Sequence, residues 1–142
     1  MNRIRPLAIC VFRHKDCILV AEGYDPVKNE FFYRPLGGGI EFGEYSAQTI
    51  RRELLEEIGA EVCDLEFLGT LESVYVFNGI PGHEIIQIYD GVLKDPELYE
   101  KTEIIGQEVD IDDSFRAVWK KIDEFGNGKS ILYPTGLLEM LK

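Results

Sequence analysis

The order of hydrophobic and polar positions predicts a series of short strands interrupted by one periodic helix. Apolar runs at 7–12 and 17–21, separated by four polar residues, indicate two strands joined by a turn. Residues 31–33 form a third candidate strand. Residues 65–77 and 84–93 are typical of strands joined around the turn-forming segment 78–82, and 115–122 of a last strand. Most of the chain is therefore expected to be sheet.

Between residues 46 and 58 the hydrophobic period becomes helical. Apolar positions recur at spacings of three and four residues, at Ala47, Ile50, Leu54 and Ile58. Ser46 is the expected N-cap and Gly59 the expected C-terminal stop. A short helix is expected at 134–141, after a proline near its first position. Strands on both sides of a central helix predict an α/β layered sandwich around a mixed sheet, within a single domain spanning 1–142.

Three consecutive glycines, at 37–39, precede the predicted helix. Glycine favours unusual backbone angles and close backbone approach, so we expect this segment to be a loop and not regular structure. Such a loop can offer bare carbonyl oxygens to a ligand.

Charge and composition narrow the class of partner. Fifteen basic residues against 26 acidic residues give a net charge of −11, the wrong sign for binding nucleic acid through its phosphates. No stretch approaches the roughly 20 apolar residues of a membrane span, and the first residues do not resemble a signal peptide. We therefore expect no nucleic-acid or membrane partner, and a cytoplasmic protein.

The cysteines and histidines of the chain are not arranged as metal ligands, so oxygen ligands are favoured over sulfur or nitrogen. Cys10, Cys17 and Cys63 form no C-x-x-C pair and are expected to be buried reduced thiols. His14 and His83 are far apart and are interpreted as turn residues. Any metal should then be a hard cation with oxygen ligands.

The helix carries three acids on one face. Glu53, Glu56 and Glu57 fall together at 100° per residue, at the rim of the apolar stripe. Like charges at these spacings repel one another, and a divalent cation would neutralise them. The alternative is a solvated acidic face without a ligand.

The residues around these acids argue against a solvated face. The segment resembles the Nudix box, G-x5-E-x7-R-E-U-x-E-E-x-G-U, in which U is a bulky aliphatic residue. The matching positions are Gly38, Glu44, Arg52, Glu53, Leu54, Glu56, Glu57 and Gly59. Ala60 departs from the pattern, where the family usually carries Ile, Leu or Val. The match is strict from Gly38 to Gly59 and loose elsewhere.

Resemblance to the Nudix hydrolases implies an α/β/α sandwich in which the box forms a loop-helix-loop. It implies that Glu53, Glu56 and Glu57 ligate Mg²⁺, with Mn²⁺ as a possible substitute, helped by a backbone carbonyl of Gly37 or Gly38. Arg52 and Glu44 resemble the members that orient these acids. The implied activity is Mg²⁺-dependent cleavage of a diphosphate linkage, with attack of a metal-activated water at phosphorus.

Several assignments stay open. Glu53 is the first candidate for the general base, but some relatives use a glutamate from a later loop. Residues 94–113 are interpreted as such a loop, and its glutamates cannot be ranked: Glu97, Glu100, Glu103 and Glu108.

Substrate contacts are equally open. Arg34 is a candidate for binding a substrate phosphate, or else an exposed arginine at a strand end. Four aromatic residues could stack on a base or belong to the core: Tyr33, Tyr75, Phe77 and Tyr89.

The box does not identify the group attached to the diphosphate. Nucleoside triphosphates, nucleotide sugars such as ADP-ribose, and dinucleoside polyphosphates all fit, with a lean towards MutT-like enzymes because the chain is short. A non-catalytic Nudix-fold nucleotide-binding or sensor domain is the alternative, although such domains tend to have lost acids of the box. The oligomeric state is not predicted.

Overall fold

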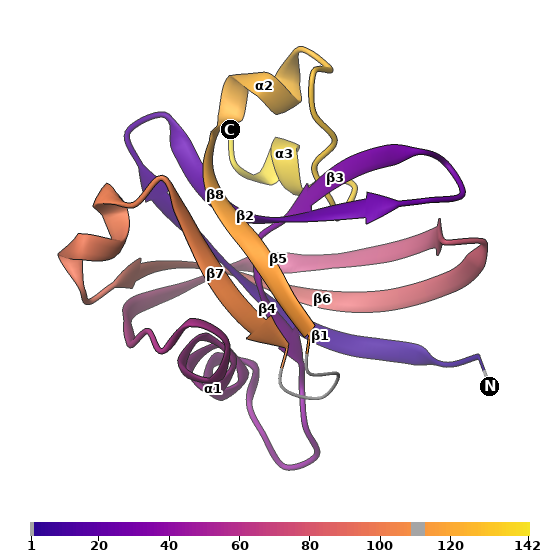
Figure 1. The fold of residues 1–142 in the computed structure, drawn as a ribbon. Coiled ribbons are helices and arrows are strands. Elements are labelled where there is room, and N and C mark those ends of the chain that lie inside the picture. Colours follow the sequence, from indigo (N-terminus) through magenta and orange to yellow (C-terminus); the bar gives the residue numbers. More distant parts are fainter. Residues whose placement is uncertain (1, 109–112) are drawn as a thin grey trace.

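The computed structural model describes residues 2–108 and 113–142 and has a mixed β-sheet with helices on both sides (Figure 1). The strands are β1 (Ile4–His14), β2 (Cys17–Asp25), β3 (Glu30–Arg34), β4 (Leu36–Gly39), β5 (Val62–Phe77), β6 (Ile80–Leu93), β7 (Glu103–Glu108) and β8 (Asp113–Lys121). The helices are α1 (Ser46–Ile58), α2 (Ile122–Gly126) and α3 (Leu137–Met140), with a 3₁₀ helix η1 (Pro96–Glu100). The predicted α/β class is confirmed.

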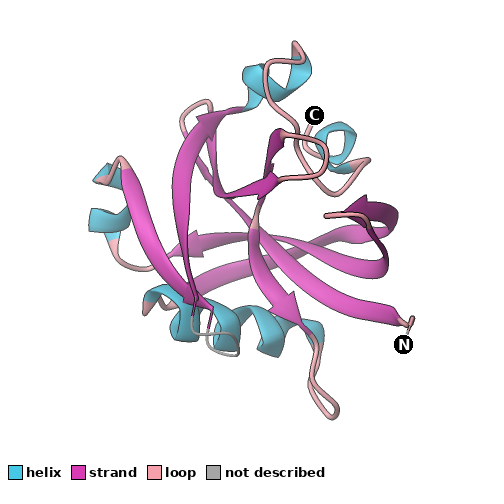
Figure 2. Cartoon of the chain, turned by 45° about the vertical axis from the view of Figure 1, so that its right-hand side comes forward, coloured by secondary structure: helices cyan, strands magenta, loops and turns pink. Residues whose placement is uncertain are grey.

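The sheet divides around β1. Along most of its length β1 pairs in parallel with β6. Its residues 7–10 also pair antiparallel with β4, and only its last two residues pair with β2. The strand order is β5-β6-β1-β2-β8-β7, with β3 paired to β2. Figure 2 shows α1 on one side of the strands and the two short helices on the other. This arrangement is the sandwich that the Nudix resemblance implied.

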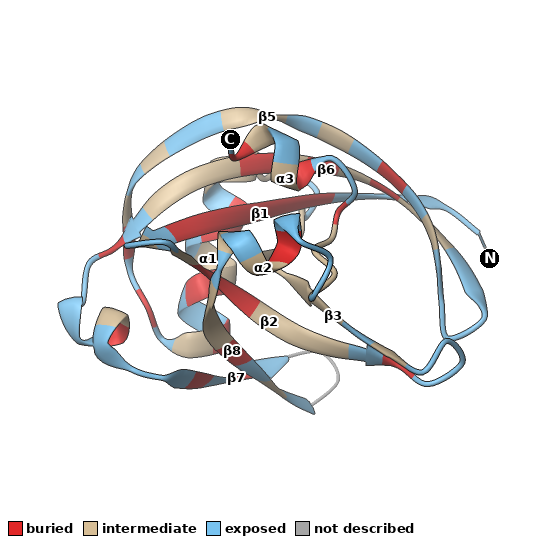
Figure 3. Cartoon of the chain, turned by 90° about the horizontal axis from the view of Figure 1, so that it is seen from above, coloured by how far each residue is buried: buried red, intermediate tan, exposed pale blue. Residues whose placement is uncertain are grey.

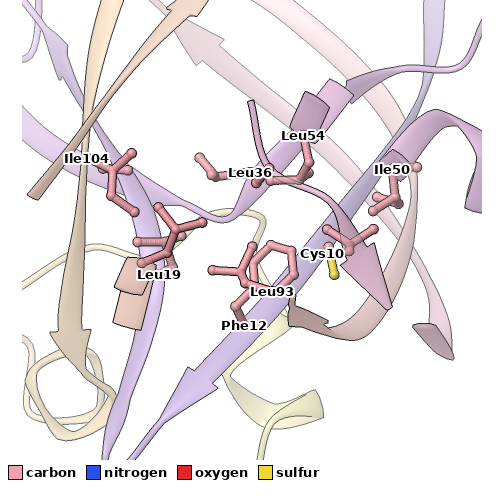
Figure 4. Packing of buried hydrophobic residues seen from close by; sticks show 13 residues of the cluster. Cys10, Phe12, Leu19, Leu36, Ile50, Leu54, Leu93 and Ile104 are labelled. Carbon is pink, nitrogen blue, oxygen red and sulfur yellow. The ribbon is translucent and has the colours of Figure 1, made fainter. Parts of the chain in front are cut away.

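Strand β1 lies at the centre of the core, and its sequence explains why. Residues 7–12 are all apolar, as is typical of a strand covered on both faces. Successive side chains point to opposite faces, so Ala8, Cys10 and Phe12 pack towards α1 while Leu7 and Ile9 pack towards α3. Figure 3 shows β1 buried along its middle, and Figure 4 shows the cluster that includes Cys10, Phe12, Ile50 and Leu54. The core therefore has two parts, one on each side of β1.

Helix α1 has the predicted bounds, but its N-terminus differs from the expectation. The N-cap is Tyr45, whose backbone N–H donates to the Gln48 side chain. Ser46, the expected cap, instead forms a 2.6 Å hydrogen bond with the Tyr89 hydroxyl. At the other end Gly59 has a left-handed φ of 66° and ends the helix as expected.

The glycine segment was wrongly predicted to be irregular. Residues 36–39 form β4, paired with β1 in the register Ala8↔Gly38 and Ile9↔Gly37. The expected close approach is nevertheless present. A Cβ at Gly37 would lie 2.1 Å from the Ala8 carbonyl oxygen, and one at Gly38 would lie 2.4 Å from the Glu53 carboxyl carbon. The glycines are thus needed to bring β4 against both β1 and the α1 acids.

Several further expectations were wrong. Residues 94–113 are not one loop but contain η1 and β7, and α2 follows β8 without having been predicted. The C-terminal helix is confined to residues 137–140. His83 lies within β6, and His14 ends β1 packed against the rings of Tyr99 and Trp119. All three cysteines are free, but only Cys10 is fully buried.

Three aromatic rings lie over glycines on the neighbouring strand. Phe32 covers Gly23, Tyr75 covers Gly82 and Phe115 covers Gly106, each pair directly opposite in register. A Cβ at any of these glycines would lie 2.2–2.4 Å from the ring above it.

Among the described residues, none of the helices has the length and apolar character that a membrane span requires.

Candidate functional site

Arg52 is the centre of a charged network on α1. Its guanidinium makes two hydrogen bonds to Glu44, from Nε at 2.8 Å and from Nη2 at 3.0 Å. Nη1 donates to Glu53 at 2.8 Å and to Glu56 at 3.3 Å, and Nη2 also donates to the Gly39 carbonyl at 3.0 Å. The hydrogen bonds from Arg52 lower the pKa of Glu44 to about 2, so Glu44 is ionised. Arg52 therefore ties the helix acids to β4.

Glu57 is the exception, because no cationic side chain of residues 2–108 and 113–142 forms an ion pair with its buried carboxyl group. Its side chain is nearly buried, and Oε1 has no hydrogen-bond partner among the described residues. Burial, followed by the negative charges of Glu108 and Glu53, raises the pKa of Glu57 to about 9. Burial also raises the pKa of Glu53, although Arg52 opposes this. Leaving a buried polar atom unpaired costs free energy, so an unpaired carboxylate is informative about function.

These acids fit a hard cation, although the described part of the chain holds no group of three acidic, histidine or cysteine side chains already gathered around one point. The orphaned Glu57 Oε1 lies near further carboxylates from Glu53 and Glu108. The backbone at Gly38 lies against the Glu53 carboxylate, where a Cβ would collide with it. Carboxylate and carbonyl oxygens are the ligands that Mg²⁺ prefers.

A cavity of about 260 Å³ opens on the other side of the β1–β6 pair. Aromatic and charged side chains share its wall, including Phe32, Phe77, Tyr133, Arg5, Arg34 and Glu84. Pockets that combine apolar walls with a few polar groups are typical ligand sites. The cavity therefore has the character of a binding site for a ring-containing group.

Glu84 is a second buried carboxylate, and it is surrounded by donors. Its side chain is 4% exposed. Tyr75 donates its hydroxyl to Oε2 at 2.9 Å, Arg5 donates to the same oxygen at 3.4 Å, and Arg34 Nη1 lies 3.7 Å from Oε1. Arg34 also weakly opposes the burial-driven rise in the pKa of Glu57. Arg34 therefore lines the cavity and also acts electrostatically on the acidic site.

The structure divides the sequence candidates. Tyr75 and Phe77 line the cavity, whereas Tyr33 donates to Glu22 outside it and Tyr89 bonds Ser46 near α1. Of the four unranked glutamates, Glu108 comes next to Glu57, and Glu103 pairs with Arg116. Glu97 and Glu100 lie in η1, at the other end of β7.

Sequence reasoning missed most of the cavity wall, including four of its aromatic and charged residues. They are Arg5, Phe32, Glu84 and Tyr133. Glu84 had a usable signal, because the alternation of β6 puts it on the same face as Ile86 and Ile88. A carboxylate on the apolar face of a strand is unusual.

Comparison with known proteins agrees with the geometry. Residues 1–134 match the NUDIX domain family. No curated protein matches the chain.

Solved structures with the same fold are numerous, and three illustrate the range. A NUDIX hydrolase from Nitrosomonas europaea has a TM-score of 0.65 at 20% identity, over 98% of this chain and 86% of that one. A MutT NUDIX hydrolase from Burkholderia pseudomallei has a TM-score of 0.66 at 17% identity, over 99% of this chain and 100% of that one. An ADP compounds hydrolase has a TM-score of 0.58 at 19% identity, over 89% of this chain and 63% of that one.

These structural likenesses establish the fold, and the family match extends over nearly the whole chain. The expectations of a Nudix member and of a hydrolase are confirmed. The chain belongs to the NUDIX domain family of hydrolases.

Proposed function

We propose that this single-domain protein is a Mg²⁺-dependent pyrophosphohydrolase that cleaves the diphosphate linkage of a nucleoside diphosphate derivative. The observation that carries the proposal is Glu57, a buried carboxylate with an unpaired oxygen next to two further acids. Such a cluster is unfavourable by itself and becomes favourable when it holds a cation. We assign the metal to Glu53, Glu56 and Glu57, with a backbone carbonyl of Gly37 or Gly38.

The remaining residues of the box orient these ligands. Glu44 accepts hydrogen bonds from Arg52, from Thr49 Oγ1 at 2.7 Å and from the Glu41 backbone at 3.1 Å, so it is fixed. Arg52, held by Glu44, in turn fixes Glu53 and Glu56. Orienting partners of this kind are a common requirement of metal sites.

The reaction needs cations because the chain and the diphosphate are both anionic. Bound Mg²⁺ would neutralise phosphoryl oxygens and acidify a water. The side chain of Arg34 makes no hydrogen bond within the described residues, so its N–H donors are available. We assign it to a substrate phosphate. The aromatic cavity, which Arg34 also lines, is assigned to the group attached to the diphosphate.

We favour two residues as candidates for the general base. Glu53 lies against Gly38 and accepts a hydrogen bond from Arg52, which stabilises its charged form. Glu108 is exposed at the end of β7, close enough to raise the pKa of Glu57 after burial has done so. Glu108→Gln separates them, because Glu53 is also assigned to the metal and its loss lowers kcat in either case. A large loss of kcat in Glu108→Gln assigns the base to Glu108, and near wild-type kcat assigns it to Glu53.

The proposal is tested with a panel of substrates in Mg²⁺ and Mn²⁺, followed by product identification. The panel contains nucleoside triphosphates, ADP-ribose and other ADP compounds, and dinucleoside polyphosphates. We expect a nucleoside monophosphate and a phosphorylated remainder, with ¹⁸O from water on a phosphate. Label on a sugar carbon, or no hydrolysis of any member, would contradict the proposal.

A further inference from the structure

The cavity poses a problem that the proposed hydrolysis does not explain. A carboxylate is costly to bury, and Glu84 is 4% exposed at the wall of a cavity assigned to an anionic substrate. Its negative charge should repel the diphosphate. A role for Glu84 must therefore lie in what it holds and not in direct contact with the phosphates.

Glu84 is held firmly on one side. The Tyr75 hydroxyl donates to Oε2 at 2.9 Å, and Arg5 approaches the same oxygen at 3.4 Å. Tyr75 is itself fixed, because its ring lies over Gly82, the residue opposite it on β6. The position of the carboxylate is therefore determined by the sheet.

On the other side, the interaction of Glu84 with Arg34 is an ion pair without a hydrogen bond. Oε1 lies 3.7 Å from Arg34 Nη1, beyond hydrogen-bond distance, and no hydrogen bond within the described residues uses the Arg34 side chain. The side chain is 40% exposed. A guanidinium has five N–H donors in a planar fork. The fixed carboxylate of Glu84 therefore attracts Arg34 to one place while the Arg34 donors stay free.

That place is next to the acidic site. Arg34 ends β3, and Gly38 in β4, four residues later, lies against the Glu53 carboxylate. Four residues of chain span at most about 14 Å. Arg34, whose side chain lines the cavity, therefore has its backbone within about 14 Å of the segment that contacts the α1 acids.

We propose that Glu84 is a positioning residue for Arg34: its buried carboxylate, fixed by Tyr75 and Arg5, holds the guanidinium at the junction of the cavity and the acidic site, with its donors free for a diphosphate. This inference rests on the proposed function. It predicts that Glu84 acts on substrate affinity and only through Arg34.

The experiment is a double-mutant cycle with methylene-bridged ADP, which cannot be hydrolysed, as the binding probe in Mg²⁺. Calorimetry should show Arg34→Gln weakening the affinity about 20-fold, since a charge-assisted contact is lost. Glu84→Gln should weaken it about fivefold. The double variant should bind no more weakly than Arg34→Gln alone, because two residues that act through one contact are not additive.

Kinetics with the best substrate of the panel supply a second readout. Glu84→Gln should raise KM about fivefold and leave kcat within about twofold, as expected for lost binding that the ground and transition states share. Asp90→Asn is the matched control, because Asp90 on β6 also pairs with an arginine of β1, Arg13, at 3.1 Å, but six residues further along the strand. That variant should bind the probe like the wild type.

The inference is overturned if the Arg34→Gln and Glu84→Gln effects multiply, or if Glu84→Gln matches Asp90→Asn. If Glu84→Gln does not fold, Tyr75→Phe replaces it in the cycle, with an expected twofold to threefold loss of affinity and the same non-additivity; multiplying effects there would again overturn the inference. Failure of the wild type to hydrolyse any substrate would count against the proposed function instead, since probe binding needs no hydrolysis.

Discussion

Glu57 and Glu84 are both nearly buried glutamates, yet their surroundings are opposite. Glu84 has a hydroxyl donor and two guanidinium groups within 4 Å. Glu57 has an orphaned oxygen, and the nearest charges that act on its pKa after burial are those of Glu108 and Glu53. One carboxylate is satisfied by the folded chain, and the other is not.

The difference separates what the fold completes from what it leaves for a ligand. Native proteins pair most of their buried polar groups, so an unpaired one marks a place where stability is given up. The paired Glu84 can hold other residues in position, whereas the unpaired Glu57 is suited to accept a cation. The two carboxylates should therefore respond in opposite ways to the same substitution.

The largest expected contrast is in catalysis. Glu57→Gln should lower kcat by at least about 10²-fold, because it removes a ligand charge that stabilises the transition state. Glu53→Gln should do the same, and Glu66→Gln, on the exposed face of β5, should change little. Steady-state rates at saturating Mg²⁺ provide the measurement. Wild-type turnover in Glu57→Gln would remove the metal assignment.

The next contrast is in the stability of the metal-free protein. Glu84→Gln should lower the free energy of unfolding by about 2 kcal/mol, since it takes the charge from a site built around donors. Glu57→Gln should leave stability unchanged or higher, because at neutral pH the Glu57 carboxyl group has to take up a proton to be buried, and glutamine does not. Chemical denaturation in EDTA measures both. Equal losses in the two variants would mean that the carboxylates are not different in kind.

Metal should reverse the disadvantage of Glu57. At ten times its Kd, Mg²⁺ should stabilise the wild type by about 1.4 kcal/mol, a shift of a few degrees in Tm. The triple variant Glu53→Gln/Glu56→Gln/Glu57→Gln should show no such shift. NaCl at matched ionic strength is the control, because screening alone relieves part of the repulsion. A shift that persists in the triple variant would place the metal elsewhere.

The last contrast concerns pH in the absence of metal. Burial and the adjacent acids raise the pKa of Glu57 from 4.5 to about 9. Between pH 4.5 and pH 9, therefore, the folded protein keeps the Glu57 proton and the unfolded chain does not. Stability from this group is therefore complete below pH 4.5 and declines as pH rises towards 9. The stability of Glu57→Gln relative to wild type should increase over that window. A constant difference from pH 5 to pH 9 would show that Glu57 is not protonated in the metal-free protein.

The elements set by local sequence were the predictable ones. The bounds of α1 follow from its apolar period and from Gly59, which only has to reach a left-handed φ. The N-cap was missed because the Ser46 hydroxyl is used by Tyr89, 43 residues away. The glycine segment was missed because pairing with β1 is a tertiary contact that overrides the backbone preference of glycine.

The residues around the acids depended on strand register and topology. Glu108 could not be chosen over Glu103 because the choice requires knowing which end of β7 lies over α1. Arg34 and Glu84 are 50 positions apart, and only the β1–β6 and β2–β3 pairings bring them together. Periodicity in β6 signals that Glu84 faces inwards, but it does not reveal the arginines that meet it.

The rings seated over glycines constrain how the cavity can be remodelled. Phe32 and Tyr75 both line it, and each occupies the space that a side chain on Gly23 or Gly82 would need. Enlarging the cavity at Tyr75 leaves bare backbone open to water, and adding bulk at Gly82 displaces the ring. Single-site libraries at these positions should therefore yield mostly damaged proteins. Libraries that vary both members of a cross-strand pair together are the route by which a new cavity shape, and with it a new substrate range, becomes accessible.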